Sequence, residues 1–150
     1  MAKRILVPLD QTLEAEAALP LVVGAAREMG ATVRLLHVAP SPENVTDAGG
    51  RIVAFADQEA ARLEAEAMDY LRTVEARLDG IAVERSVRFG DPIDEILLET
   101  DEFGADLIAL TTRCPARLAR LVLGSTADQI CRRIDVAVLV YRPGRGVHAT

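Results

Sequence analysis

The segment from Asp106 to Pro143 constrains the fold more than any other part of the chain. It begins with a short apolar strand, continues through a long arginine-rich loop, and reaches a helix start at Gly124 and Ser125. A second apolar run, Val136–Tyr141, follows that helix. A strand, a helix and a strand in this order predict a parallel pair with a helical crossover. Because backbone N–H groups at a helix start favour a phosphate group, the same segment also predicts an anion site.

Strand and helix patterns alternate along the rest of the chain. Short apolar and β-branched runs predict three more strands, at Arg4–Leu9, Thr32–Val38 and Ala82–Arg88, besides Leu107–Leu110 and Val136–Tyr141 of the segment above. Helical periodicity and caps predict helices at Leu13–Met29, Arg51–Leu78 and Pro92–Phe103. Five strands joined by helices predict a single α/β domain over residues 1–150, a doubly wound parallel sheet with helices on both faces.

Local signals refine the first expected helix and predict one long loop. Pro20 falls inside the first expected helix, where we expect it to kink the chain. Glu16 lies in the first turn of that helix, where a solvated carboxylate favours the helix dipole. The stretch Ala39–Gly50, rich in proline and glycine, predicts a long loop without regular structure.

The net charge of −6 argues against a nucleic-acid-binding domain. The charge is unevenly spread, because residues 113–145 hold seven arginines and two aspartates, hence +5 there and −11 elsewhere. These arginines form either a solvated face or an anion site around Gly124, and the two interpretations stay open.

No feature of the sequence predicts export, a membrane or a metal. Pro8 and Asp10 come too early for a signal-peptide core, and no apolar run approaches the roughly 18 residues that a membrane span needs. The two cysteines, Cys114 and Cys131, show no metal-ligand spacing and are expected as reduced thiols. We therefore expect a cytoplasmic protein without a membrane partner. His37 lacks a nucleophile at a recognisable spacing, so no catalytic residue is assigned.

Several segments, in this order, resemble the universal stress protein family across essentially the whole chain. They are ILVPLD, the proline-containing helix, LLHV, the Gly90–Pro92 turn, GADLIAL, LGSTADQICRR and VAVLVYRP. The resemblance implies a fold like that of adenine nucleotide alpha hydrolases, with strand order 3-2-1-4-5. It also implies an ATP site, and a homodimer formed through the C-terminal strand.

The family resemblance transfers to particular residues of a nucleotide site. It implies that Asp10 faces adenosine, that the Val38 backbone meets adenine, and that Gly124 and Ser125 hold phosphates. Asp10 could equally cap a turn before Thr12, and Val38 could simply pack within its strand.

The family's ATP signature is glycine, two residues, glycine, nine residues, then glycine with serine or threonine. Here Thr111 and Cys114 occupy the first two glycine positions. Both add side chains where phosphates approach, and a β-branched threonine disfavours positive φ. Arg113 could supply positive charge instead.

We therefore expect a homodimeric stress-response or regulatory binding module with weak or absent ATP binding, rather than an enzyme. The sequence does not identify a cofactor, and ATP or another phosphate-bearing anion is the candidate ligand. The alternative hypothesis is an ATP- or AMP-binding universal stress protein with slow hydrolysis.

Overall fold

The computed structural model describes residues 3–111 and 125–142, and a five-stranded parallel sheet forms their centre. The strand order is β5-β2-β1-β6-β7, which confirms the expected order 3-2-1-4-5. The five strands are β1 (Arg4–Pro8), β2 (Thr32–Ala39), β5 (Ala82–Phe89), β6 (Leu107–Thr111) and β7 (Ala137–Tyr141).

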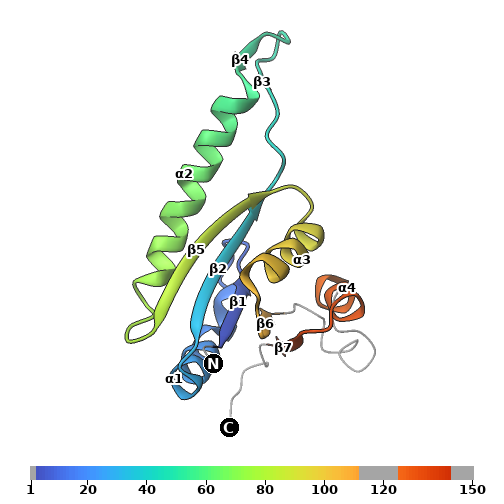
Figure 1. Cartoon of the computed structure of the whole chain (residues 1–150). Helices are drawn as coiled ribbons and strands as arrows, with labels where there is room; N and C mark the ends of the chain where they lie inside the picture. Colours follow the sequence, from blue (N-terminus) through green and yellow to red (C-terminus); the bar gives the residue numbers. More distant parts are fainter. Residues whose placement is uncertain (1–2, 112–124, 143–150) are drawn as a thin grey trace.

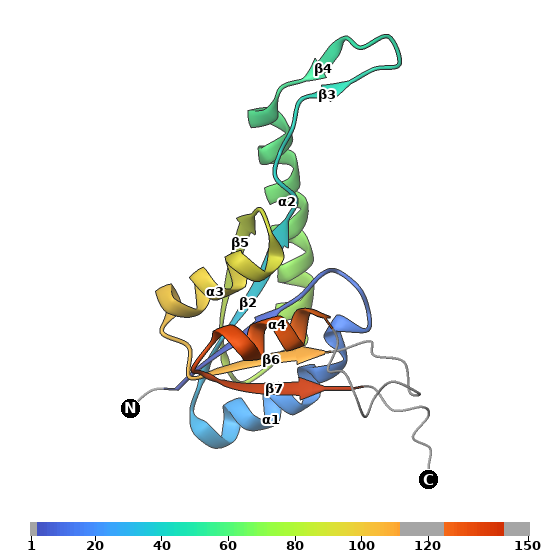
Figure 2. The same ribbon diagram turned by 90° about the vertical axis from the view of Figure 1, so that its right-hand side faces the viewer.

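Helices cover both faces of the sheet, as the sequence predicts (Figures 1 and 2). One face packs against α1 (Leu19–Met29) and α2 (Ala56–Glu75). The other packs against α3 (Pro92–Phe103) and α4 (Ser125–Arg133). The inner strands are buried on both faces, since neighbouring residues such as Ile5 and Leu6 enter opposite clusters and are both fully buried.

Capping chemistry explains where α3 begins and ends. The Asp91 side chain accepts a hydrogen bond from the Asp94 N–H at 3.0 Å, and Pro92 occupies the first turn. Gly104 ends the helix in the left-handed conformation, with φ of 69°, where glycine carries no Cβ penalty. These predicted boundaries are confirmed.

The expected start of the first helix at Leu13 and its kink at Pro20 are both wrong, while its expected end at Met29, before the left-handed Gly30, is confirmed. A 3-10 turn, η1 (Ala15–Ala18), comes first, and α1 begins only at Leu19. Pro20 therefore lies in the first turn of α1, where its missing N–H has no partner to lose. The proline helps to start the helix and does not bend it.

The region between β2 and α2 also differs from the prediction. Two short antiparallel strands, β3 (Val45–Thr46) and β4 (Ile52–Ala54), replace part of the expected loop and the first turn of the expected helix. Asp47 shapes the turn between them, because its Oδ1 accepts from the N–H groups of Gly49 and Arg51, both at 2.9 Å.

This hairpin and the first half of α2 project away from the sheet as an arm, residues 44–66 (Figures 1 and 2). The first buried residue of α2 is Ala67, beyond the arm. The arm therefore contributes no residue of α2 to the hydrophobic core.

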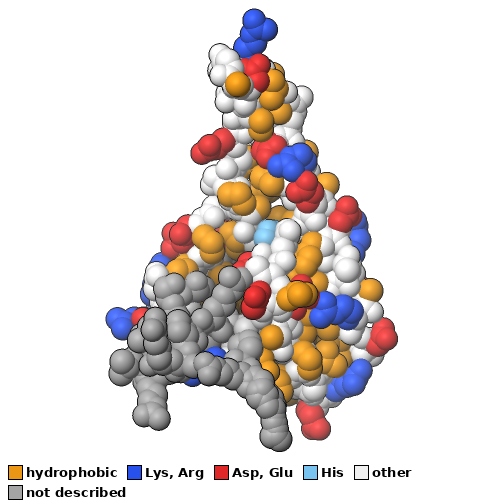
Figure 3. All heavy atoms as spheres, turned by 180° about the vertical axis from the view of Figure 1, so that it is seen from behind, with side chains coloured by type: hydrophobic (Ala, Val, Ile, Leu, Met, Phe, Trp, Pro, Cys, Tyr) orange, Lys and Arg blue, Asp and Glu red, His pale blue; other side chains and the backbone are white. Residues whose placement is uncertain are grey.

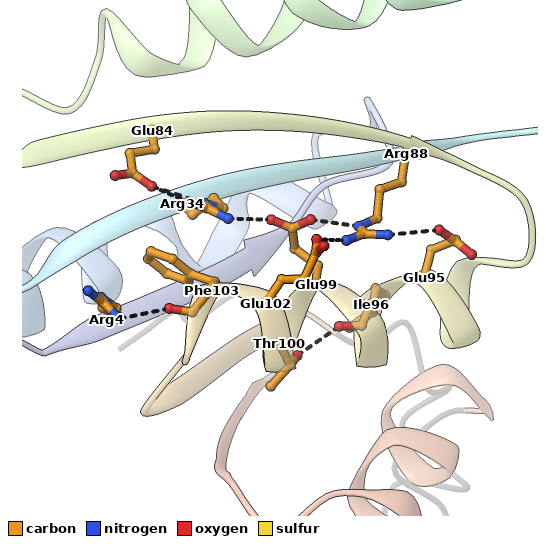
Figure 4. A network of polar contacts seen from close by, with 10 residues as sticks. All are labelled: Arg4, Arg34, Glu84, Arg88, Glu95, Ile96, Glu99, Thr100, Glu102 and Phe103. Carbon is orange, nitrogen blue, oxygen red and sulfur yellow. Dashed lines mark hydrogen bonds and ion pairs between the residues drawn. The ribbon is translucent and has the colours of Figure 1, made fainter.

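A buried ion cluster holds α3 against β2 and β5 (Figure 4). Glu99 of α3 is 2% exposed, and its two carboxylate oxygens accept from Arg34 and from Arg88, each at 2.6 Å. The Arg34 guanidinium also lies over the Phe103 ring, 4.1 Å from its centroid. Because both arginines sit on strands, the cluster fixes the position of α3 on the sheet.

Candidate functional site

A pocket of about 240 Å³ opens where the C-terminal ends of β1, β2 and β6 meet the start of α3. Here the chain direction across the sheet reverses, since β2 and β6 lie on opposite sides of β1. Ligands of open α/β sheets bind at this topological switch point. The pocket wall is largely apolar, with Leu36, Pro92, Ile96 and Leu110 among its residues.

The pocket brings together three of the seven residues that the sequence assigned to a ligand. Asp10, Val38 and Thr111 line it, each from a different strand end. Ser125 begins α4, so the predicted helix start at this position is confirmed. Contacts between these residues and a ligand stay predictions.

The remaining sequence assignments cannot be placed in the pocket. Arg113, Cys114 and Gly124 lie outside the described residues, and so does the side chain of Ser125. Their proposed contacts with phosphate groups stay predictions.

Asp10 organises the turn that leaves β1. Its Oδ1 accepts from the Thr12 N–H at 3.1 Å and from the Thr12 hydroxyl at 2.6 Å. The Thr12 Oγ1 in turn accepts from the Ala15 N–H at 3.1 Å. Gln11 between them has φ of 69°, in the left-handed region that a side chain disfavours. Asp10 therefore has the capping role considered from the sequence, while it also borders the pocket.

Thr111 joins β6 to η1 at one side of the pocket through a hydrogen bond. Its hydroxyl donates to the Ala15 carbonyl of η1 at 3.3 Å. Thr111 also belongs to β6, in register with Tyr141 of β7, so its backbone is extended. The left-handed conformation that a glycine could adopt here is thus not adopted.

His37 is a packed residue on the opposite face of β2 from Val38. Its Nδ1 lies 2.8 Å from the Leu9 carbonyl, and its Nε2 lies 3.4 Å from the Gln11 side-chain amide. Its ring meets Tyr70 edge-on, with 6.4 Å between the centroids. These contacts support the β1 turn and show no nucleophile beside the imidazole.

Glu16 is buried, so the prediction of a solvated carboxylate at this position is wrong. It is 7% exposed, and its carboxylate accepts from the Tyr70 hydroxyl at 2.6 Å and from Arg77 at 2.5 Å. Burial raises the pKa of Glu16, but these two donors outweigh it and hold that pKa below its ordinary value. The sequence offered no sign of this contact, because its partners lie more than fifty positions away.

The apolar wall is the part of the pocket that the sequence reading missed. Pro92 and Ile96 come from α3, and Leu36 and Leu110 come from β2 and β6. The Gly90–Pro92 turn was the available signal, since it announces a helix start at the end of a strand.

Within the described residues, no group of three or more His, Cys, Asp or Glu side chains could hold a metal ion. The helices of the same residues include none long and apolar enough to cross a membrane.

Comparison with known proteins decides the family. The model of the universal stress protein family matches residues 1–142. The chain belongs to the universal stress protein family. Universal stress protein G of Shigella flexneri is 31% identical over 147 residues, which cover 95% of this chain and all of that protein.

Solved structures show the same fold. The protein MJ0577 of Methanocaldococcus jannaschii aligns with a TM-score of 0.75 and 23% identity, covering 96% of this chain and 98% of that one. A universal stress protein in complex with cAMP aligns with a TM-score of 0.65 and 19% identity, over 93% of this chain and 96% of that one. The universal stress protein from Archaeoglobus fulgidus in complex with dAMP aligns with a TM-score of 0.59 and 19% identity, over 92% of this chain and 96% of that one.

Proposed function

We propose that this universal stress protein is a homodimeric regulatory module whose pocket binds the adenosine part of an adenine nucleotide and binds ATP weakly. The observation that carries the proposal is the pocket at the switch point, where Asp10, Val38 and Thr111 meet. Two family members of the same fold, solved with cAMP and dAMP, support the ligand class. A cytoplasmic location and a single domain remain predictions from the sequence.

The lining suits a nucleoside. Apolar side chains from β2, β6 and α3 offer surfaces for a purine ring, and the Asp10 carboxylate offers an acceptor for ribose hydroxyls. A volume of about 240 Å³ is small beside the roughly 300–1,000 Å³ of typical ligand pockets. The pocket therefore fits a nucleoside better than a complete triphosphate.

We expect the phosphate groups to contact the start of α4 and the segment before it, as the family resemblance implies. The start of α4 supplies backbone N–H groups that favour an anion. Thr111 and Cys114 replace the two glycines that would let backbone approach a triphosphate. We infer that a single phosphate is accepted more readily than three.

Calorimetric titration with AMP, ATP and inorganic phosphate tests this proposal. AMP should bind at least as tightly as ATP, and inorganic phosphate should bind far more weakly than either. If none of the three binds, the nucleotide part of the proposal fails. Asp10→Asn should weaken AMP, while Asp79→Asn, an exposed aspartate far from the pocket, serves as the matched control.

The double substitution Thr111→Gly and Cys114→Gly tests the cause of weak ATP binding. Removing both side chains should tighten ATP by about ten- to a hundredfold, or ~1–3 kcal/mol. AMP affinity, which depends less on this loop, is the internal control. Low-micromolar ATP binding by the unchanged protein, with no gain on substitution, would show that the interpretation of these two positions is wrong.

The homodimer is proposed to form through β7. This strand lies at the edge of the sheet and pairs with β6 on one side only among the described strands. Its residues are apolar on both faces, and an apolar edge strand favours association. In a two-fold interface Val138→Arg places a charge on both sides, so it should weaken the interface and give a lower molecular mass by light scattering. An unchanged mass would contradict this interface.

The alternative function is ATP or AMP binding with slow ATP hydrolysis, which the Gly124-Ser125 helix start favours. Release of ADP from bound ATP over several hours, abolished by Asp10→Asn, would favour that alternative. ATP that stays intact over the same period would favour the binding module.

A further inference from the structure

The arm, residues 44–66, exposes apolar side chains that its own packing does not explain. Val45, Ile52, Val53 and Phe55 are 38%, 49%, 62% and 58% exposed. They lie on or beside a hairpin whose strands have two and three residues. A two-stranded hairpin is marginally stable in water without a partner. Figure 3 shows hydrophobic side chains gathered among charged ones along this projecting end.

The arm carries unpaired charges of opposite sign on either side of Phe55. Arg51 follows the hairpin turn, and Glu64 lies on the exposed first half of α2. Among the described residues, neither side chain has a hydrogen-bond or ion-pair partner. Arg62 nearby differs, because its guanidinium is already engaged by Glu59 and Glu66.

The spacing of these two charges is symmetric about Phe55. Arg51 lies four residues before it, about 13 Å at the rise of a strand. Glu64 lies nine residues after it, also about 13 Å at the rise of a helix. The hairpin continues outward from the N-terminal end of α2. The distances from Phe55 to Arg51 and from Phe55 to Glu64 therefore run in opposite directions along the arm (Figures 1 and 2).

We propose that the arm is a self-association surface that binds the arm of a second copy in antiparallel orientation. A two-fold axis near Phe55 places each Arg51 level with the partner's Glu64, and the two contacts are identical by symmetry. The exposed apolar residues of each hairpin then pack against the opposite arm, where water leaves their surfaces. A parallel arrangement would instead bring the two Arg51 side chains together.

The pattern of charges on the arm, rather than its net charge, favours a second copy over other occupants, because two net-negative arms attract each other only where Arg51 meets the partner's Glu64. The arm's five carboxylates and two arginines leave it net negative, which opposes an anionic lipid surface or a nucleic acid. A second copy supplies both the apolar surface and the opposite charges at the required spacing. This surface is distinct from β7, so the two interfaces together would produce assemblies larger than a dimer.

Sedimentation velocity of four variants tests the arm interface separately from β7. Val138→Arg should leave a dimer held by the arms, and adding Phe55→Asp should convert it to a monomer. Leu98→Asp, at a site 52% exposed on α3, is the matched control and should leave the mass unchanged. Phe55→Asp alone should break the arm interface and leave a dimer held by β7.

Two outcomes would overturn the proposal. One is a folded Val138→Arg variant that is monomeric at high micromolar concentration. The other is a Phe55→Asp variant that associates as strongly as its parent, with the helical circular dichroism of both retained.

A charge exchange tests the pairing itself and alters only exposed residues. Arg51→Glu and Glu64→Arg should each weaken the arm interface by about tenfold, because each places like charges together twice. The double variant restores both pairs and should return to within about threefold of the parent. A double variant no tighter than either single variant would refute the antiparallel arrangement.

Discussion

Two clusters of arginine and glutamate behave differently in this protein because they sit in different surroundings. Under α3, Glu99 lies between Arg34 and Arg88, and its side chain is 3% exposed. On the arm, Arg62 lies between Glu59 and Glu66, and its side chain is 54% exposed. Both clusters place complementary charges in direct contact. Only the first one removes its central charge from water.

The comparison shows that burial, and not the number of ion pairs, determines how much such a cluster contributes to the free energy of unfolding. Burial raises the pKa of Glu99, but hydrogen bonds from Arg88 and Arg34 outweigh it, so that pKa lies below its ordinary value. Removing one member would leave buried charge without compensation. On the exposed helix, water replaces a lost partner at little cost.

The largest effect is expected from Glu99→Ala. Breaking a buried pair by removing one partner costs about 3–5 kcal/mol of unfolding free energy, to be measured by urea denaturation. Glu102→Ala is the matched control on the same helix, since Glu102 also contacts Arg88 but its side chain is 69% exposed. A surface pair of that kind contributes about 0–1 kcal/mol. Equal losses in the two variants would contradict the comparison.

The stability that Glu99 contributes should depend on pH. Because its pKa is lowered in the folded state, the contribution is complete above the unfolded pKa of about 4.3 and is lost as the pH falls through the folded value. The difference in unfolding free energy between the parent and Glu99→Ala should therefore shrink from pH 7 toward pH 3. A difference that stays constant over this range would show that the charge of Glu99 is not responsible.

A smaller effect is expected at the second buried carboxylate, Glu16. Tyr70→Phe removes one hydrogen bond to it and leaves Arg77 in place, so the loss should be about 1–2 kcal/mol. Thr73→Val, which removes an exposed hydroxyl from the same helix as Tyr70, is a suitable control. A Tyr70→Phe variant as stable as its parent would mean that Arg77 alone satisfies the carboxylate.

The smallest effect is expected on the arm. Arg62→Gln should leave the midpoint of urea denaturation unchanged within error, because Arg62 and its partner Glu66 are exposed and water replaces the lost contacts. A clear loss of stability would indicate that Arg62 itself is buried in solution. Repeating the measurement with Phe55→Asp then separates burial in a second copy from a contact within one chain.

The residues of the candidate site also fall into two groups, those that the sequence could assign and those that depend on contacts between distant elements. Asp10, Val38 and Thr111 could be assigned from the sequence because the family resemblance implies them, and because the carboxyl ends of parallel strands lie at one edge of the sheet. The apolar wall from Pro92 and Ile96 could not, because it depends on where α3 packs. The ion pairs of Glu99 set that position, and they join residues up to 65 positions apart.

By itself, the sequence determined the alternation of strands and helices, the caps of α3, and the strand order implied by the family resemblance. These follow from local chemistry, such as the Asp91 cap and the conformation of Gly104, and from the short list of ways to connect parallel strands. Tertiary structure alone decided that Glu16 is buried, that Pro20 lies in the first turn of a helix, and that residues 44–66 project from the sheet. The reason is physical: whether a charge or an apolar side chain meets water depends on elements distant in sequence, which no local pattern encodes.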